Sequence, residues 1–135
     1  MDKVILAKKV DSILRCLNRI ENRMPSTEVD FFKDYDAQDV VVLNLTRAIQ
    51  MSVDIATHIL ASKDGAVPET MAGAFVGLQR LGIITDETAN NMCCSVSFRN
   101  VAVHAYDDID MAITYAVAHD HLDDFKQYIS QILSC

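Results

Sequence analysis

The sequence contains few residues that interrupt helices: four glycines and two prolines occur among 135 residues, and tryptophan is absent. Half of the chain is hydrophobic, and much of that half is alanine, leucine, isoleucine and methionine. This combination favours long helices over turn-rich β architectures. At this length we expect one domain, residues 1–135, with a single core.

The sequence also lacks any 18-residue stretch without charge, so we expect no membrane-spanning helix. Its first twenty residues have an acid at position 2, frequent charges and no small-residue cleavage site, which indicates a helix and not a secretion signal. The four cysteines (Cys16, Cys93, Cys94 and Cys135) are therefore expected to be free thiols in a reducing, cytoplasmic compartment. No CxxC pair occurs, so we expect no zinc cluster, and the three internal cysteines are predicted to be buried.

Positive charge is scarce and unevenly placed. The net charge of −7 has the wrong sign for a general nucleic-acid binder, and no DNA binding is expected. Residues 1–23 hold six basic against three acidic residues, so this segment carries +3 and the remainder −10. A basic helix on an acidic body can meet an acidic partner or a phosphate backbone, although a solvated polar face is the simpler interpretation.

Apolar residues recur at three- and four-residue intervals and predict two long N-terminal helices. The first covers residues 3–23 and ends before Pro25, which disfavours a helical conformation in its predecessor. The second covers residues 36–61 and is apolar around most of its circumference, as expected of a buried central helix. Its polar side chains form a narrow line of Asn44, Arg47, Asp54 and His58.

Loop and capping residues place the remaining helices. In the loop SKDGAVPE, Gly65 is a flexible stop and Pro68 suits the first turn of a short third helix over residues 69–81. Thr85 is the expected N-cap of a fourth helix that runs through Tyr106.

After a break at DDID, a fifth helix over residues 109–133 ends the domain. No strand alternation is long enough to predict a sheet. The predicted fold is an all-α, mostly antiparallel bundle of four long helices and one short helix.

The stretch RNVAVHAY (residues 99–106) places four chemically active side chains on one element. On a continuous helix Arg99 and Tyr106 share a face, and Asn100 lies close enough to His104 to orient its imidazole. Arginine binds phosphate bidentately, and histidine transfers protons near neutral pH. The set suits phosphodiester cleavage, with Arg99 stabilising the phosphate and His104 handling the proton of the 2′-hydroxyl or leaving group.

No acidic cluster suited to magnesium lies beside this motif in the sequence, so we expect metal-independent chemistry without a cofactor. The structural alternative is a helix C-terminus in which Arg99 forms an ion pair and protonated His104 interacts with the last carbonyls.

Two other polar groups deserve comparison with the motif. The run HDHLDD (residues 119–124) can offer a metal only two donors from one helix face, as His119 with Asp123 or His121 with Asp124, so a solvated face is expected. Asp54 and His58 are four residues apart and predict a buried ion pair or cap-type contact. Alternatively, Asp54 supports Arg99 from behind.

Four segments of the chain resemble, in the same order, those of the HepT-like branch of the HEPN superfamily. They are residues 39–59 (DVVVLNLTRAIQMSVDIATHI), 68–84, the motif at 99–106, and 121–129. The resemblance implies a HEPN-like bundle that dimerises with its motif helices facing each other across a composite cleft. It also implies a metal-independent endoribonuclease toxin, made with a minimal nucleotidyltransferase antitoxin.

Transferred to this sequence, the resemblance implies that Arg99 and His104 are the catalytic pair and that Asn100 is the polar residue after the arginine. It implies that Tyr106 is the tyrosine that the antitoxin adenylylates. Dimerisation also answers a geometric objection: residues five apart on a helix point about 140° apart, so one chain cannot present Arg99 and His104 squarely to one phosphate.

Alternatives to these roles remain open from the sequence. The chain can be a non-catalytic helical module that binds a nucleotidyltransferase, with Arg99 and His104 serving structure. Tyr106 can be an aromatic that stacks on an RNA base and is never modified.

Overall fold

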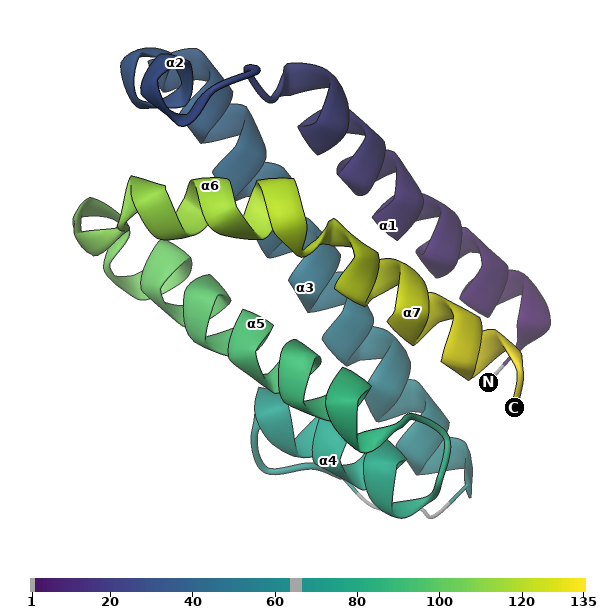
Figure 1. Ribbon diagram of the computed structural model, residues 1–135. Helices are drawn as coiled ribbons and strands as arrows, with labels where there is room; N and C mark the ends of the chain where they lie inside the picture. Colours follow the sequence, from purple (N-terminus) through teal and green to yellow (C-terminus); the bar gives the residue numbers. More distant parts are fainter. Residues whose placement is uncertain (1, 64–66) are drawn as a thin grey trace.

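The computed structural model describes residues 2–63 and 67–135, and within them the secondary structure is helical, with no strand (Figure 1). The elements are α1 (Lys3–Arg23), α2 (Glu28–Lys33), α3 (Tyr35–Lys63), α4 (Met71–Arg80), α5 (Asp86–His104), the 3-10 turn η1 (Tyr106–Asp108), α6 (Met111–Asp120) and α7 (Leu122–Leu133). The predicted all-α class is confirmed.

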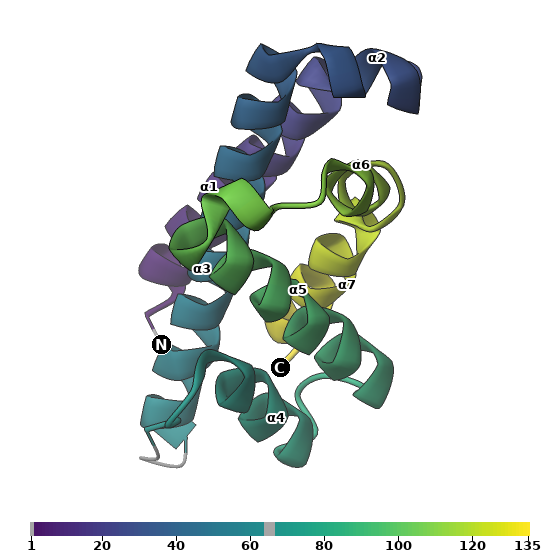
Figure 2. The ribbon, with the colours of Figure 1, turned by 90° about the vertical axis from the view of Figure 1, so that its left-hand side faces the viewer.

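The long helices run alternately in opposite directions, so the predicted antiparallel arrangement is also confirmed. Figure 1 shows α1, α3, α5 and the α6–α7 pair lying along one diagonal, with α4 below α5. Figure 2 shows α1 beside α3 on one side of the molecule and α5 beside α6–α7 on the other. Helix α3 contacts helices of both sides, because apolar residues cover most of its surface.

The core consists of the apolar stripes that the periodicity predicts. Those of α1 and α3 are buried, and Phe75 and Leu78 of α4 face inward, while Met24 at the end of the α1 stripe is half-buried. By length and composition α3 is apolar enough to cross a membrane, but 56% of its most apolar window is buried within the protein. That burial is typical of the central helix of a bundle.

Several predicted boundaries are wrong. The short helix α2 was not predicted; Thr27 caps it by accepting a hydrogen bond from the Asp30 amide. Helix α4 begins after its N-cap Thr70, so Pro68 precedes the helix and does not occupy its first turn. Gly65 lies outside the described residues. Gly82 does terminate this segment, in the left-handed conformation (φ +73°) that glycine tolerates.

The predicted helix over residues 109–133 is two helices. His121 leaves the helical conformation (φ −117°, ψ 8°), although the sequence has no glycine or proline there. The break lets α6 pack on α2 and α3 while α7 packs on α5. Tertiary packing therefore decides this boundary, and local sequence does not.

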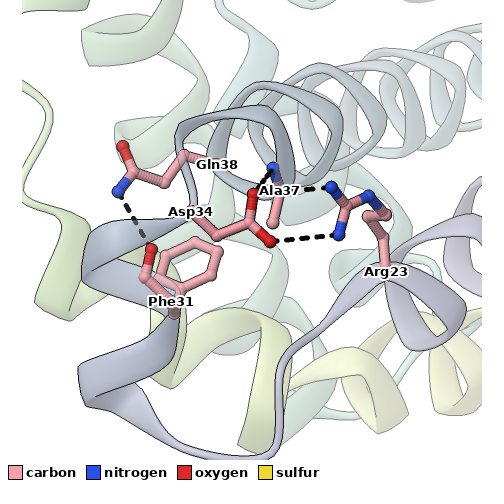
Figure 3. A network of polar contacts seen from close by, with 5 residues as sticks. All are labelled: Arg23, Phe31, Asp34, Ala37 and Gln38. Atoms are coloured by element: carbon pink, nitrogen blue, oxygen red, sulfur yellow. Dashed lines mark hydrogen bonds and ion pairs between the residues drawn. The ribbon is translucent and has the colours of Figure 1, made fainter.

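The junction of α1, α2 and α3 is closed by a polar network (Figure 3). Arg23 donates two hydrogen bonds to the Asp34 carboxylate, at 3.2 and 3.4 Å, and Asp34 also accepts the Ala37 amide at 3.0 Å. The Gln38 side chain donates to the Phe31 carbonyl at 3.0 Å. The network thus ties α2 to the start of α3 and pairs every charge that it contains.

The cysteines are all free, but they do not share one environment. Cys16 is buried as predicted, and burial raises the pKa of its thiol. Cys93 is half-buried and Cys94 is exposed, so the prediction of burial is wrong for Cys94. Met92 and Val96, on either side of this pair, are the residues of this part of α5 that lie in the core.

Candidate functional site

Helix α5 carries most of the predicted site and ends earlier than expected. Thr85 is its N-cap, as predicted, and accepts a hydrogen bond from the Thr88 amide. The helix stops at His104 because Ala105 adopts a non-helical conformation (φ −144°, ψ 54°). Tyr106 therefore lies in η1, and the prediction that it shares a helical face with Arg99 is wrong.

Arg99 is half-buried and lacks an acidic partner. Its NH1 donates to Oδ1 of Asn100 at 3.3 Å, whereas its Nε is buried and has no hydrogen-bond partner. Within residues 2–63 and 67–135, no carboxylate forms an ion pair with it. The structural alternative, in which Arg99 is held by an ion pair, does not describe this environment.

Asn100 and His104 are both exposed. The carbonyl oxygen of Asn100 accepts from Arg99, and no hydrogen bond joins this amide to His104 in the described structure. The predicted role of Asn100 in orienting the imidazole is therefore wrong for the single chain; its contact positions Arg99 instead. His104 stands in the last turn of α5.

Tyr106 is fixed by a residue that sequence reasoning missed. The side chain is 48% exposed, and its hydroxyl donates a hydrogen bond of 2.6 Å to Oδ1 of Asp39, in the second turn of α3. This hydrogen bond raises the pKa of the Tyr106 phenol above its ordinary value, with smaller contributions from partial burial and from the charges of Asp39 and Asp107. Asp39 begins one of the segments that carry the family resemblance, but no local pattern relates it to a tyrosine 67 residues away.

Asp54 does not support Arg99. Its Oδ1 accepts a hydrogen bond of 3.1 Å from Gln50, one turn earlier on α3, and it pairs neither with Arg99 nor with His58 in the described residues. His58 is exposed. A short carboxylate side chain on a helix reaches its i−4 neighbour more readily than a group on another helix, which explains the outcome.

The run HDHLDD is a solvated face, as predicted. His119 contacts Asp120 at 2.7 Å and His121 contacts Asp124 at 3.2 Å, and both histidines are exposed. In the described part of the chain, no three His, Cys, Asp or Glu side chains lie close enough together to hold a metal ion.

A cavity of about 540 Å³ lies between α5 and the α6–α7 pair. Its lining is mostly apolar and includes Phe98, Val101 and Ile113. Arg99, His104 and Tyr106 are not among its lining residues. These three side chains therefore lie outside the cavity, at the end of α5 and in η1, although Val101 of the same stretch lines it.

With this geometry established, comparison with known proteins identifies related chains. The sequence matches the family described as Ribonuclease HepT-like over residues 13–132. The mRNA nuclease HepT of Shewanella oneidensis is 34% identical over 128 residues, covering 95% of this chain and 96% of its own. The tRNA nuclease HepT of Aphanizomenon flos-aquae is 30% identical over 139 residues, covering 99% and 91% respectively.

The fold is also shared with a solved complex. The tri-AMPylated Shewanella oneidensis HEPN toxin, in complex with MNT antitoxin, matches with a TM-score of 0.92 and 32% sequence identity. The match covers 100% of both chains. The similarity therefore includes the whole bundle and is not confined to the motif at the end of α5.

Proposed function

This chain belongs to the HepT-like ribonuclease family, which confirms the predicted family and the endoribonuclease class, and on that premise we propose how its own residues act. The chain is the toxin of a toxin–antitoxin pair and cleaves RNA in the cytoplasm without a metal ion. Arg99 binds the scissile phosphate, and His104 is the general acid or base.

The observation that carries this proposal is the state of Arg99. A guanidinium nitrogen that is buried without a hydrogen-bond partner is costly, so proteins rarely leave one unless a ligand completes it. A phosphate accepts several N–H groups of arginine at once and supplies the missing negative charge. Asn100 accepts a hydrogen bond from NH1 of Arg99 and so helps to position the guanidinium.

His104 complements Arg99 because it is exposed on the last turn of the same helix. Attack by a 2′-hydroxyl requires a group that accepts its proton, and histidine is the side chain that most often serves as general acid or base. The angular separation of these two residues on one helix supports a homodimer in which Arg99 of one chain acts with His104 of the other. Val103, an exposed apolar residue of α5 that does not line the cavity, offers apolar area for such an interface.

We infer that a minimal nucleotidyltransferase antitoxin neutralises this toxin by adenylylating Tyr106. The related toxin of known structure is AMPylated and bound to an MNT antitoxin. Tyr106 is half exposed and follows His104 by two residues, so an added phosphate and adenosine occupy the place where the RNA backbone must lie. Arg99 then binds the added phosphate in place of the substrate.

Cleavage of single-stranded RNA by the purified chain in the presence of EDTA tests the nuclease proposal. Arg99→Ala and His104→Ala each abolish cutting, while the exposed controls Arg80→Ala and His119→Ala retain it. Circular dichroism and dimer mass stay unchanged in all four variants. Cutting that survives both motif substitutions refutes the proposal and leaves a non-catalytic module that binds the nucleotidyltransferase.

Mixing the two inactive variants tests the composite cleft. In a heterodimer of Arg99→Ala with His104→Ala, one of the two sites is complete if the pair acts across the interface. Because random pairing makes about half of the dimers heterodimers, the mixture regains roughly a quarter of the wild-type activity. If Arg99 and His104 act within one chain, the mixture stays inactive. Refolding the variants together, with each homodimer refolded alone as the control, ensures that subunits exchange.

Intact mass after co-expression with the antitoxin tests the modification. The wild-type chain gains the mass of one or more AMP groups, and Tyr106→Phe gains none while remaining toxic. Mass gain in Tyr106→Phe, or AMP mapped to Tyr35, Tyr115 or Tyr128, contradicts the assignment. A toxin that is never modified by the antitoxin supports the role of Tyr106 in stacking on a base.

A further inference from the structure

The phenol of Tyr106 binds the carboxylate of Asp39, which neither caps a helix nor forms an ion pair among the described residues. The hydrogen bond from Tyr106 Oη to Asp39 Oδ1 measures 2.6 Å, as expected for a hydroxyl bound to an ionised acid. Asp39 lies beyond the first turn of α3, and Asp34 caps that turn by binding the Ala37 amide. Asp39 forms no ion pair with any residue of the described ranges.

Both partners of this hydrogen bond are accessible to another protein. Tyr106 and Asp39 are exposed residues, and they come from η1 and from α3. An enzyme that approaches Tyr106 therefore meets a phenol whose proton is already directed at an acceptor. This arrangement is the one that protein kinases build on the enzyme side, where an aspartate accepts the proton of the substrate hydroxyl.

We propose that Asp39 is the proton acceptor when Tyr106 is adenylylated, so that the toxin supplies a catalytic residue for its own neutralisation. This inference rests on the proposed modification of Tyr106. In the step, Tyr106 Oη attacks the α-phosphorus of ATP held by the antitoxin. The Oη–P bond forms, the bond from phosphorus to the bridging oxygen breaks, pyrophosphate leaves, and the phenolic proton moves to Asp39, which later releases it to water.

The resting state of the tyrosine is consistent with this role. Because the hydrogen bond that Tyr106 donates to Asp39 favours the protonated phenol and raises its pKa, very little phenolate exists near neutral pH. A protonated phenol is a weak nucleophile, so the proton must leave during the transfer. A base already in contact with it removes the need for the antitoxin to position one of its own.

The test compares the initial rates of AMP addition to wild-type chain and to Asp39→Asn, measured by intact mass with saturating ATP and antitoxin. Asparagine retains an oxygen that accepts the hydrogen bond but cannot take the proton, so the rate at pH 7 falls about 10²–10⁴-fold. Asp39→Glu restores the carboxylate and most of the rate. Asp107→Asn is the matched control: it removes the neighbouring charge, leaves the hydrogen bond intact and keeps the wild-type rate.

The pH profile separates proton transfer from positioning. The rate of Asp39→Asn divided by that of wild type increases about tenfold per pH unit between pH 7 and 9, because hydroxide generates the phenolate that Asp39 otherwise provides. Dividing the two rates removes the pH dependence of the antitoxin itself, because both chains are assayed with the same antitoxin. Equal rates, or a reduced rate with a constant ratio, overturn the proposal for Asp39. An unmodified wild-type chain overturns the proposed function with it, whereas a modified wild type with an equally modified Asp39→Asn overturns Asp39 alone.

Discussion

Two half-buried arginines, each near the C-terminal end of its helix, differ in the groups that they bind. Arg23 ends α1 and donates two hydrogen bonds to Asp34, and the resulting network closes the junction of α1, α2 and α3 (Figure 3). Among residues 2–63 and 67–135, Arg99, near the end of α5, has a hydrogen bond with its neighbour Asn100 and no partner for its Nε. The charge of a paired arginine is already balanced by a carboxylate, whereas an unpaired arginine can still bind an anion.

Two tyrosines extend the comparison. Tyr128 of α7 is fully buried, packs edge-to-face on Phe75 and donates a hydrogen bond of 2.8 Å to the Ser52 carbonyl. Tyr106 is half exposed, and its hydroxyl meets the carboxylate of Asp39. Burial raises the pKa of the Tyr128 phenol and makes it chemically inert, while the exposed phenol of Tyr106 remains reachable. Arginine and tyrosine each occur in both regions. The group that a side chain binds, more than its residue type, therefore distinguishes a structural residue from a candidate site residue.

The largest expected effect comes from exchanging each arginine for lysine, which keeps the charge and removes the planar fork. Arg99→Lys lowers the rate of RNA cleavage about 10²–10³-fold, because an ammonium group cannot reproduce the paired N–H contacts to phosphate. Arg23→Lys leaves cleavage unchanged and lowers the free energy of unfolding by at most about 1 kcal/mol, since its ion pair is partly exposed to solvent. Cleavage assays and urea unfolding measure both effects. Equal loss of cleavage in the two variants would break the comparison.

A smaller effect separates the tyrosines. Tyr128→Phe keeps the buried ring but removes the hydroxyl that binds the Ser52 carbonyl, so urea unfolding shows a loss of about 1–2 kcal/mol. Tyr106→Phe changes stability by less than about 0.5 kcal/mol, because its hydrogen bond is exposed to water. If Tyr106→Phe is the more destabilised variant, the Asp39 contact is structural and the contrast fails.

The smallest effect concerns the pH dependence of the scaffold. The Ala37 amide, and then the Arg23 guanidinium, hold the pKa of Asp34 below its ordinary value. The ionised carboxylate therefore contributes stability above the ordinary value of about 3.9, and this contribution is lost as pH falls through the lower folded value. Asp34→Asn is thus less stable than wild type at pH 7, and the gap in urea midpoint narrows below about pH 4. Asp36→Asn, which removes an exposed acid two residues away and leaves the Arg23–Asp34 pair intact, is the control for the loss of one charge.

Much of the scaffold was predictable because the signals are local. The stripes of α1 and α3 recur at helical intervals, and all of their predicted members except the half-buried Met24 lie in the core. Thr85 caps α5 through a contact three residues away. Interactions of this range depend on residues adjacent in the chain, so a sequence pattern encodes them directly.

Errors arose where elements far apart in the chain decide the outcome. The break at His121 carries no glycine or proline and follows from the different neighbours of α6 and α7. Asp54 had the correct spacing and charge to support Arg99, yet it binds Gln50 on its own helix. A side chain such as Asp54 has several possible partners in the sequence, and only the packed structure selects among them.

By itself the sequence determined the helical class, the placement of Arg99, Asn100 and His104 on one element, and the family, because periodicity, spacing and segment order are properties of the chain alone. The tertiary structure decided that Arg99 has no acidic partner in the part of the chain that the structure describes, and that Tyr106 leaves the helix and binds Asp39. Both results depend on how α5 and η1 dock against α3. A hydrogen bond between residues 67 apart exists only after the bundle forms, so no sequence interval predicts it.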